Sequence, residues 1–446
     1  MEVIADCGRM QTSPIVVSSF IYTTISCVLS TMGGFVMLWV DQKEGRAMIS
    51  QRIRQARTIA GLSQDEVVQA LDGRGVSLTK AALSKYERGS SVPRASLLKQ
   101  LGEVLCVPAE YFLREPDVSI EWFAFRKRAT VGTREQDRVK AVASERVESY
   151  VRLRESLTLD PVKPFPNCLP FATLNDAEAA AGRLRKAWDL DDLPIESLTD
   201  LIEDREGVVV EVEGSEDTVD GLAGLANGRH AVVVVDPSVE DDRKRFTLAH
   251  ELGHLVMDKA AVKDMAEGER MANRFASAFL VPKKVAVKEL GEKRTRLSFE
   301  ELKLLKMKHG LSMQAWVYRA RDCGIIEDQH FRFLFDQMSR MGIRRKEPVE
   351  YKGRERPQRF MQMVLRALAE GLLSQKQALE LCPQLAFNLT GSDAEKARAA
   401  DLRALPVDQR DALLARAAES LAGHYAADTE LTDFDAFDDE SEEVHT

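Results

Sequence analysis

Residues 243–258 read RKRFTLAHELGHLVMD and hold the pattern H-E-x-x-H in His250, Glu251 and His254. The run follows a strand-like segment and is expected to form a helix. Because positions i and i+4 share one face of a helix, both imidazoles can bind the same Zn²⁺ ion. Glu251 reaches the same edge and can take a proton from a water on the metal, whose pKa the metal lowers to about 7.

A zinc hydrolase needs a third protein ligand, and the next helical run offers one. The run ERMANRFASAFLVP (269–282) begins with Glu269, the expected ligand, and Glu267 is the second choice. Asn273 lies four residues later on the same side, where it can hydrogen-bond a ligand histidine. Two of the seven histidines fall in H-E-x-x-H, whereas His230 is expected to be an exposed loop histidine and is left unassigned.

The residues around this pattern predict an α+β domain over 171–290. Helices are expected to begin near Asn175 and Pro194, before a strand over 208–213. Residues 221–236 are expected to form a hairpin around Asn227-Gly228, a pair typical of tight turns. The domain should therefore hold a small sheet.

The two helical runs, with the hairpin before them, resemble the ImmA/IrrE metallopeptidase family. The resemblance implies a zincin-like fold. It also implies zinc ligands at His250, His254 and Glu269, and a general base at Glu251.

The segment 48–115 is expected to be an all-helical domain. After a first helical stripe, Ser63 caps a second helix, Thr79 caps a third over 80–88, and a fourth covers 94–105.

Two runs in this segment, IRQARTIAGLSQDEV (53–67) and TKAALSKYERGSSVPRASLLKQL (79–101), resemble the XRE (Cro/repressor-like) helix-turn-helix family. The resemblance implies an internal ion pair between Arg57 and Glu87 and a DNA-reading third helix. One departure is a longer turn between the two central helices, which leaves the docking angle undefined.

The third helix carries the expected DNA contacts. Lys80, Ala81 and Lys85 share a face on which small and cationic groups can enter the major groove of double-stranded DNA. Thr79 at the start of that helix belongs to the same interface. Gln64, with the backbone amides at the start of the second helix, is expected to contact phosphates. The alternative is a helical bundle that binds protein.

Composition supports a multidomain, mainly α-helical protein. The chain has 446 residues, enough for roughly three domains. Its 44% hydrophobic content excludes global disorder. The net charge of −9 arises from the end of the chain, because residues 428–446 hold nine acids and no lysine or arginine. Six scattered cysteines without a C-x-x-C pair exclude a disulfide framework and a cysteine zinc site.

Residues 116–170 are expected to be a helical connector. The long helix from Arg134 to Leu157 carries an apolar stripe, which most often packs within its own chain. Pairing of two chains through the stripe would instead make a homodimer with two DNA-reading heads. A cluster of prolines over 161–170 is expected to be a linker.

The leader, residues 1–47, has two interpretations. Its uncharged stretch is long enough for a membrane span over 14–40, which needs about 20 apolar residues. The favoured interpretation is that translation begins at Met48. A signal peptide is not expected, because acids flank the stretch and no cleavage site follows. Both interpretations place the functional domains in the cytoplasm.

The rest of the chain is expected to be a helical region over 291–425 and an acidic disordered tail over 426–446. Helices near 298–308 and 312–320 form a basic pair, for which packing on the peptidase domain is favoured over a second DNA contact. The cations of this pair are Lys303, Lys306, Lys308, Arg319 and Arg321.

Three functions fit these predictions. The favoured one is a transcription regulator whose zinc metallopeptidase domain cuts a protein partner, such as a repressor, or the chain itself. The alternative is a regulator whose zinc domain only senses or stabilises. A plain metallopeptidase whose small domain docks a protein ranks third. Intact ligands together with Glu251 favour retained chemistry, because a structural site needs no base.

Overall fold

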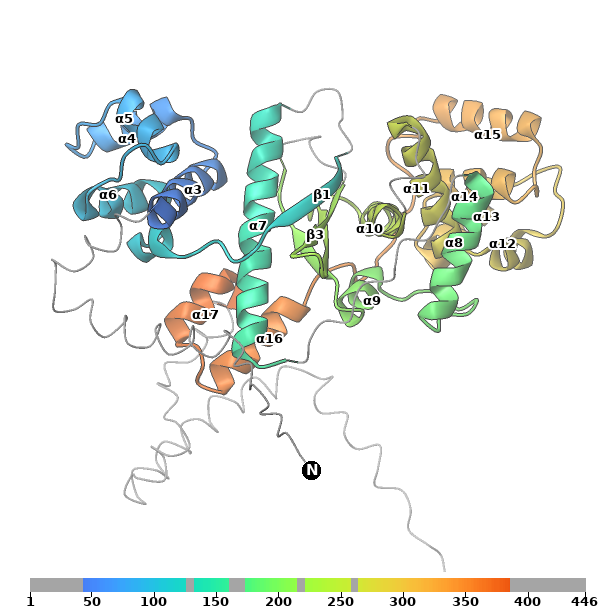
Figure 1. The fold of residues 1–446 in the computed structure, drawn as a ribbon. Helices are drawn as coiled ribbons and strands as arrows, with labels where there is room; N and C mark the ends of the chain where they lie inside the picture. Colours follow the sequence, from blue (N-terminus) through green and yellow to red (C-terminus); the bar gives the residue numbers. More distant parts are fainter. Residues whose placement is uncertain (1–42, 126–131, 160–172, 215–220, 258–263, 386–446) are drawn as a thin grey trace, which may run out of the picture. The chain divides into compact units, whose positions relative to one another are not determined.

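The computed structural model describes residues 43–125, 132–159, 173–214, 221–257 and 264–385 (Figure 1). The chain divides into two compact units, Met1–Met363 and Val364–Thr446. The protein is mainly helical with one small sheet, which confirms the predicted fold class.

The described part of the first unit begins with five helical segments, which form the predicted all-helical domain. Capping residues set their starts: the Ser63 side chain accepts a hydrogen bond from the Glu66 amide, and Thr79 accepts one from the Ala82 amide. The first described helix covers Lys43–Ile59 and includes Met48. The segments are α3 (Lys43–Ile59), α4 (Gln64–Asp72), α5 (Lys80–Glu87), α6 (Ala95–Leu105) and the 3₁₀ helix η1 (Ala109–Leu113).

This domain has an apolar core of its own. The core is built from residues of the five helical segments alone, among them Ile53, Leu71, Leu83 and Phe112, none more than 1% exposed. A core of its own is expected of a domain.

The predicted connector contains a strand as well as the expected helix. The strand β1 (Ile120–Phe125) precedes the helix α7 (Thr133–Ser156). The apolar stripe of α7 is buried, and α7 contacts α3 and β2 (Val208–Glu211). The stripe therefore packs within its own chain, so a homodimer would need another surface. The predicted proline linker lies outside the described residues.

The sheet has four strands in the order β1-β3-β4-β2. The strands β3 (Gly221–Ala226) and β4 (His230–Val235) form the predicted hairpin, with Asn227 and Gly228 at positive φ in its turn. β2 pairs with β4 in parallel, and β1 pairs with β3 in antiparallel fashion. The hairpin was expected, whereas β1 was not.

Two long helices pack together beside the sheet and position the candidate site. The helix α10 (Asp241–Val256) contacts β3, β4 and the helix α11 (Met265–Leu280). The helices α8 (Leu174–Ala187) and α9 (Leu198–Asp204) cover α11 and α10 respectively. A large apolar core joins these elements.

Four further helices extend the same core. The expectation that the basic pair packs on the preceding domain is confirmed, because α11 contacts α14 and both helices contribute to one core. Gly310 ends the first helix of that pair in the left-handed conformation (φ 64°). The four helices are α12 (Lys283–Leu290), α13 (Phe299–His309), α14 (Met313–Asp322) and α15 (Asp328–Arg340).

The remaining described helices are short. The helix α16 (Arg359–Ala369) crosses the boundary at Met363, and the second unit holds α17 (Gln375–Leu381) and the 3₁₀ helix η3 (Pro383–Leu385). The helices expected after residue 390 and the acidic tail lie outside the described residues.

No helix within the described ranges is both long enough and apolar enough to cross a membrane. The predicted span over 14–40 falls outside those ranges.

Candidate metal centre and DNA-reading face

His250 and His254 lie one turn apart on α10, and their Nε2 atoms approach to 3.1 Å. Both side chains are well buried, with exposed fractions of 3% and 10%. Two imidazole nitrogens at this separation form one side of a metal-binding set.

Glu269 completes that set from α11. Its carboxylate oxygens lie 3.2 Å from His250 Nε2 and 3.3 Å from His254 Nε2. The helix begins at Met265 rather than at Glu269, because Asp264 caps it by accepting a hydrogen bond from the Glu267 amide. Among the described residues, His250, His254 and Glu269 form the group that could hold a metal ion, and Glu267 does not belong to it.

The electrostatics of the three residues favour an ionised carboxylate. Burial acts to raise the pKa of the Glu269 carboxyl, but hydrogen bonds and charge from His250 and His254 outweigh it and hold the pKa far below its usual value. A carboxylate that stays ionised is the form that binds a cation.

The donor set fits zinc. Zinc bonds to imidazole nitrogen and carboxylate oxygen are about 2.0–2.2 Å long, so a tetrahedral arrangement places the donor atoms about 3.3–3.6 Å apart. The observed separations of 3.1–3.3 Å lie close to that range. Two histidines and one carboxylate also leave a fourth position for water or substrate, as hydrolytic sites require.

Asn273 lies one helical turn after Glu269 and contacts His250. Its Oδ1 accepts a hydrogen bond from His250 Nδ1–H over 3.0 Å. When His250 is neutral, this contact places the hydrogen on Nδ1 and leaves the Nε2 lone pair for a metal.

Glu251 is almost completely buried, with 2% of the residue exposed. It follows His250 on α10, and its carboxylate lies against Gly221, the first residue of β3. A β-carbon at position 221 would lie 2.8 Å from Glu251 Oε1, so a larger residue there would displace the Glu251 side chain. Sequence reasoning missed Gly221, although a glycine directly before an apolar strand was a usable signal.

His230 corrects one expectation. It is the first residue of β4 and only 8% exposed, and its ring packs edge-on against Tyr150. Burial lowers the pKa of this imidazole, as does the nearby Arg154 cation. His230 is therefore a core residue and not an exposed loop histidine, because the hairpin turn comes earlier, at Asn227 and Gly228.

The predicted DNA-reading face lies on α5. Lys80, Ala81 and Lys85 are exposed, and Lys80 Nζ forms a 2.6 Å surface ion pair with Asp65. Thr79 is exposed as the cap of the helix.

Gln64, the expected phosphate contact, forms a hydrogen bond inside this domain. Its Nε2 donates to Glu87 Oε2 over 2.8 Å, and Glu87 in turn receives two hydrogen bonds from Arg57. The structure thus contains the Arg57–Glu87 pair and adds Gln64 to it. Gln64 would have to leave Glu87 to reach a phosphate through its side chain.

The basic pair α13–α14 has few cations free for DNA. Lys306 is 1% exposed and bonds to Asp242 and Glu347, at 2.9 and 3.0 Å. Arg319 is fully buried against Glu178. Because buried charges are paired within the protein, these two cannot neutralise phosphates.

A groove of about 720 Å³ adjoins the candidate centre through Asn273. Residues of α10, α11 and α14 and of the segment after α15 line it. Sequence reasoning missed this feature, since its charges come from separated segments. Its cations are Arg243, Arg270, Arg274, Lys306, Arg321, Arg344 and Arg345.

Comparison with known proteins matches these two regions separately. Residues 203–321 match the IrrE N-terminal-like domain, a peptidase family, and residues 49–111 match a helix-turn-helix domain. The chain is similar to uncharacterized HTH-type transcriptional regulators of Sinorhizobium medicae (strain WSM419) and Rhizobium meliloti (strain 1021). Each is 31% identical over 67 residues, 15% of this chain and 45% of the relative. The chain thus spans about half the length of the curated relatives it matches.

Both predicted resemblances are confirmed by these matches. The helix-turn-helix match covers α4, α5 and the helices around them, and the peptidase-family match covers the sheet hairpin, α10 and α11. The chain carries a helix-turn-helix domain and an IrrE N-terminal-like domain of the ImmA/IrrE peptidase family.

Proposed function

We propose that the chain is a transcription regulator whose IrrE-like domain is a zinc metallo-endopeptidase that cuts a protein partner, such as a repressor, or the chain itself. Its helix-turn-helix domain would bind operator DNA through α5, as a homodimer on a pseudo-palindromic site. The family matches support the two domain types, and the peptidase family is zinc-dependent.

The observation that carries the proposal is the position of Glu251. The buried carboxylate comes from the residue next to His250, on the helix that supplies both histidines. A zinc site that only stabilises a fold needs no base beside it and closes its fourth position. A regulator whose zinc only senses or stabilises would need no general base at position 251.

Each residue of the site would have a separate role. His250, His254 and Glu269 would hold zinc, and Asn273 would keep His250 in the correct tautomer. When bound, zinc would polarise the peptide carbonyl and acidify a water. Glu251 in its ionised form would take the proton from the attacking water and deliver it to the leaving amine.

Two kinds of substitution test the proposal in the purified full-length chain. His250→Ala or Glu269→Ala should lose stoichiometric zinc and lower the melting temperature, because metal binding is linked to folding. Glu251→Gln should keep zinc and fold, because the amide is nearly isosteric, but it cannot accept the proton. Glu267→Ala is the matched control and should keep both zinc and cleavage.

The readouts are metal content, thermal melting and cleavage of protein substrates, followed by target-gene expression in the host. In a proteolytic regulator, Glu251→Gln leaves the substrate uncut and the target genes fixed in one state. A Glu251→Gln strain with normal expression and normal proteolysis would refute catalysis. A His250→Ala protein that still carries one zinc would refute the site.

A further inference from the structure

Strand β3 borders the candidate site. Its first residue, Gly221, lies against Glu251 and Thr247 of α10. β4 pairs with one side of β3, so the other side of β3 would be a sheet edge if no further strand covered it. Extended polypeptides bind such edges by adding a strand, with backbone hydrogen bonds supplying the affinity. The edge of β3 is thus where an extended segment could lie beside the proposed base.

Strand β1 occupies this edge (Figure 1). It runs antiparallel to β3, from Ile120 opposite Ala226 to Phe125 opposite Leu222. Leu222 is the neighbour of Gly221, so the described part of β1 reaches to within one position of the residue that contacts Glu251. The strand comes from the segment between the helix-turn-helix domain and α7, nearly a hundred residues before β3.

The contact between β1 and β3 depends on Gly224. A β-carbon at position 224 would lie 2.8 Å from both Ile120 Cγ2 and Trp122 Cε3, and 3.0 Å from the Glu121 carbonyl oxygen. The glycine lets the two side chains lie across β3. A bulge at Phe123 interrupts the register, and the Phe123 ring packs on the large core.

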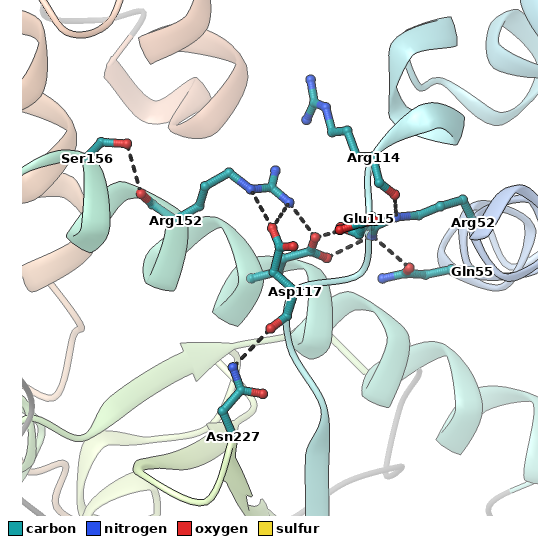
Figure 2. A network of polar contacts seen from close by, with 9 residues as sticks. Arg52, Gln55, Arg114, Glu115, Asp117, Arg152, Ser156 and Asn227 are labelled. Carbon is teal, nitrogen blue, oxygen red and sulfur yellow. Dashed lines mark hydrogen bonds and ion pairs between the residues drawn. The ribbon is translucent and has the colours of Figure 1, made fainter. Parts of the chain in front are cut away.

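The chain that enters β1 is held at two places before the strand begins. Asn227, in the hairpin turn, donates to the Asp117 carbonyl oxygen over 3.0 Å (Figure 2). It also accepts a hydrogen bond from the Ser119 amide over 2.9 Å. Arg52 of α3 donates to the carbonyl oxygens of Arg114 and Glu115, over 3.0 and 2.7 Å.

Arg52 is itself fixed by an ion pair with Glu148 of α7. The entry to β1 is therefore tied to both the helix-turn-helix domain and the peptidase sheet. A change in the position of α3 would therefore displace the residues that lead into β1.

We propose that β1 is an internal occupant of the peptide-binding edge of β3, and that a protein substrate reaches the candidate site only when β1 leaves that edge. Arg52 and Asn227 act as positioning residues that hold β1 in place. The consequence for cleavage rests on the proposed peptidase function, whereas the occupancy of the edge can be tested by binding alone.

The binding test uses the full-length, zinc-loaded chain in a Glu251→Gln background, so that no probe is cut. The probe is a fluorescent synthetic peptide with the sequence of residues 117–125, DVSIEWFAF. Ile120→Gly with Trp122→Gly removes the side chains that cover Gly224 and should free the edge. Anisotropy should show at least tenfold tighter binding by this variant than by the parent. Ile120→Val with Trp122→Phe keeps the cover and should bind like the parent.

A reversible disulfide gives a second test that does not depend on the folding of the glycine variant. Glu121 and Leu225 are paired across the two strands, so Glu121→Cys with Leu225→Cys can join β1 to β3. The oxidised chain should bind the peptide at least tenfold more weakly than the same chain after reduction, while the parent under the same treatment should not change. Equal binding by the oxidised and reduced chains, or by the parent and glycine variants, would overturn the proposal.

Cleavage of labelled casein, with Glu251 intact, separates this proposal from the proposed function. The glycine variant, in which β1 is released, should cut casein at least ten times faster than the parent chain. Tighter peptide binding without cleavage by either chain supports the occupancy of the edge and counts against the peptidase. Equal cleavage and equal binding support the peptidase and overturn the role of β1. A parent chain that cuts itself directly after β1 overturns the role as well, because β1 would then present a substrate.

Discussion

Gly221 and Glu251 lie so close that a β-carbon on Gly221 would be 2.8 Å from Glu251 Oε1 and 2.5 Å from Thr247 Cγ2. Gly221→Ala should therefore displace the carboxylate without touching the three proposed zinc ligands. A displacement of about 1 Å at a reacting group can lower a rate about 100-fold. We expect a loss of that order in cleavage rate, at full zinc content.

Gly182→Ala is the control, since a β-carbon there meets nothing within 4 Å. Full cleavage activity in Gly221→Ala would show that Glu251 can shift without cost and would weaken its assignment as the base.

Arg52→Ala should destabilise the first unit, because Arg52 and Glu148 form a buried pair with exposed fractions of 1% and 7%. Loss of one partner leaves a buried charge, which costs about 3–5 kcal/mol. Arg152 also pairs with Glu148, so we expect the lower end, about 3 kcal/mol, in urea unfolding. Arg74→Ala breaks the exposed pair with Glu103 and should cost less than about 1 kcal/mol. Equal losses of unfolding free energy in the two variants would contradict this account of the Arg52–Glu148 pair.

Lys80→Ala with Lys85→Ala should weaken DNA binding and its dependence on salt. Each lysine that neutralises a phosphate contributes about 0.9 to the slope of log K against log salt, so the slope should fall by about 1 to 2. Fluorescence anisotropy on DNA isolated from the host would measure both. Lys303→Ala with Lys308→Ala removes the same charge from the other basic pair and should leave binding unchanged. The reverse result would place the reading face on α13.

The unfolding free energy should depend on pH through Glu203. Burial raises the pKa of this carboxyl to about 7, against the lowering effect of hydrogen bonds from the amides of Arg359 and Gln358. A raised pKa means that the folded protein holds the proton more tightly than the unfolded chain. This stabilisation is complete below about pH 4.5 and is lost as the pH rises through about 7, by about 3 kcal/mol in all.

Glu203→Gln keeps the acceptor oxygen and cannot ionise, so its unfolding free energy should change less between pH 5 and pH 8 than that of the parent. Urea titrations at a series of pH values would measure the difference. Identical pH profiles would show that Glu203 does not titrate in that range.

Local patterns predicted the parts of the structure that local interactions determine. Ser63 and Thr79 begin helices because their side chains accept amide hydrogen bonds three residues on, and Asn227-Gly228 turns the hairpin because both residues adopt positive φ. The spacing of His250 and His254 in the same way follows from the helical period alone.

Such local patterns could not predict contacts between segments that are distant in the sequence. β1 is a strand only because β3, far along the chain, offers an edge with Gly224 at the crossing point. The lysine at 306 resembles a surface cation in the sequence, and only the folded chain brings Asp242 and Glu347 to it. The same holds for Gly221, whose role depends on α10.

The position of Trp122 has an optical consequence. Trp188 and Trp316 are 4% and 0% exposed, whereas Trp122 is partly exposed on β1. Departure of β1 from the sheet would transfer the Trp122 indole into water and shift its emission to longer wavelength, while the two core indoles kept theirs. With Trp39 replaced by phenylalanine, intrinsic emission would follow β1 in real time as DNA or a protein partner is added, with no label attached.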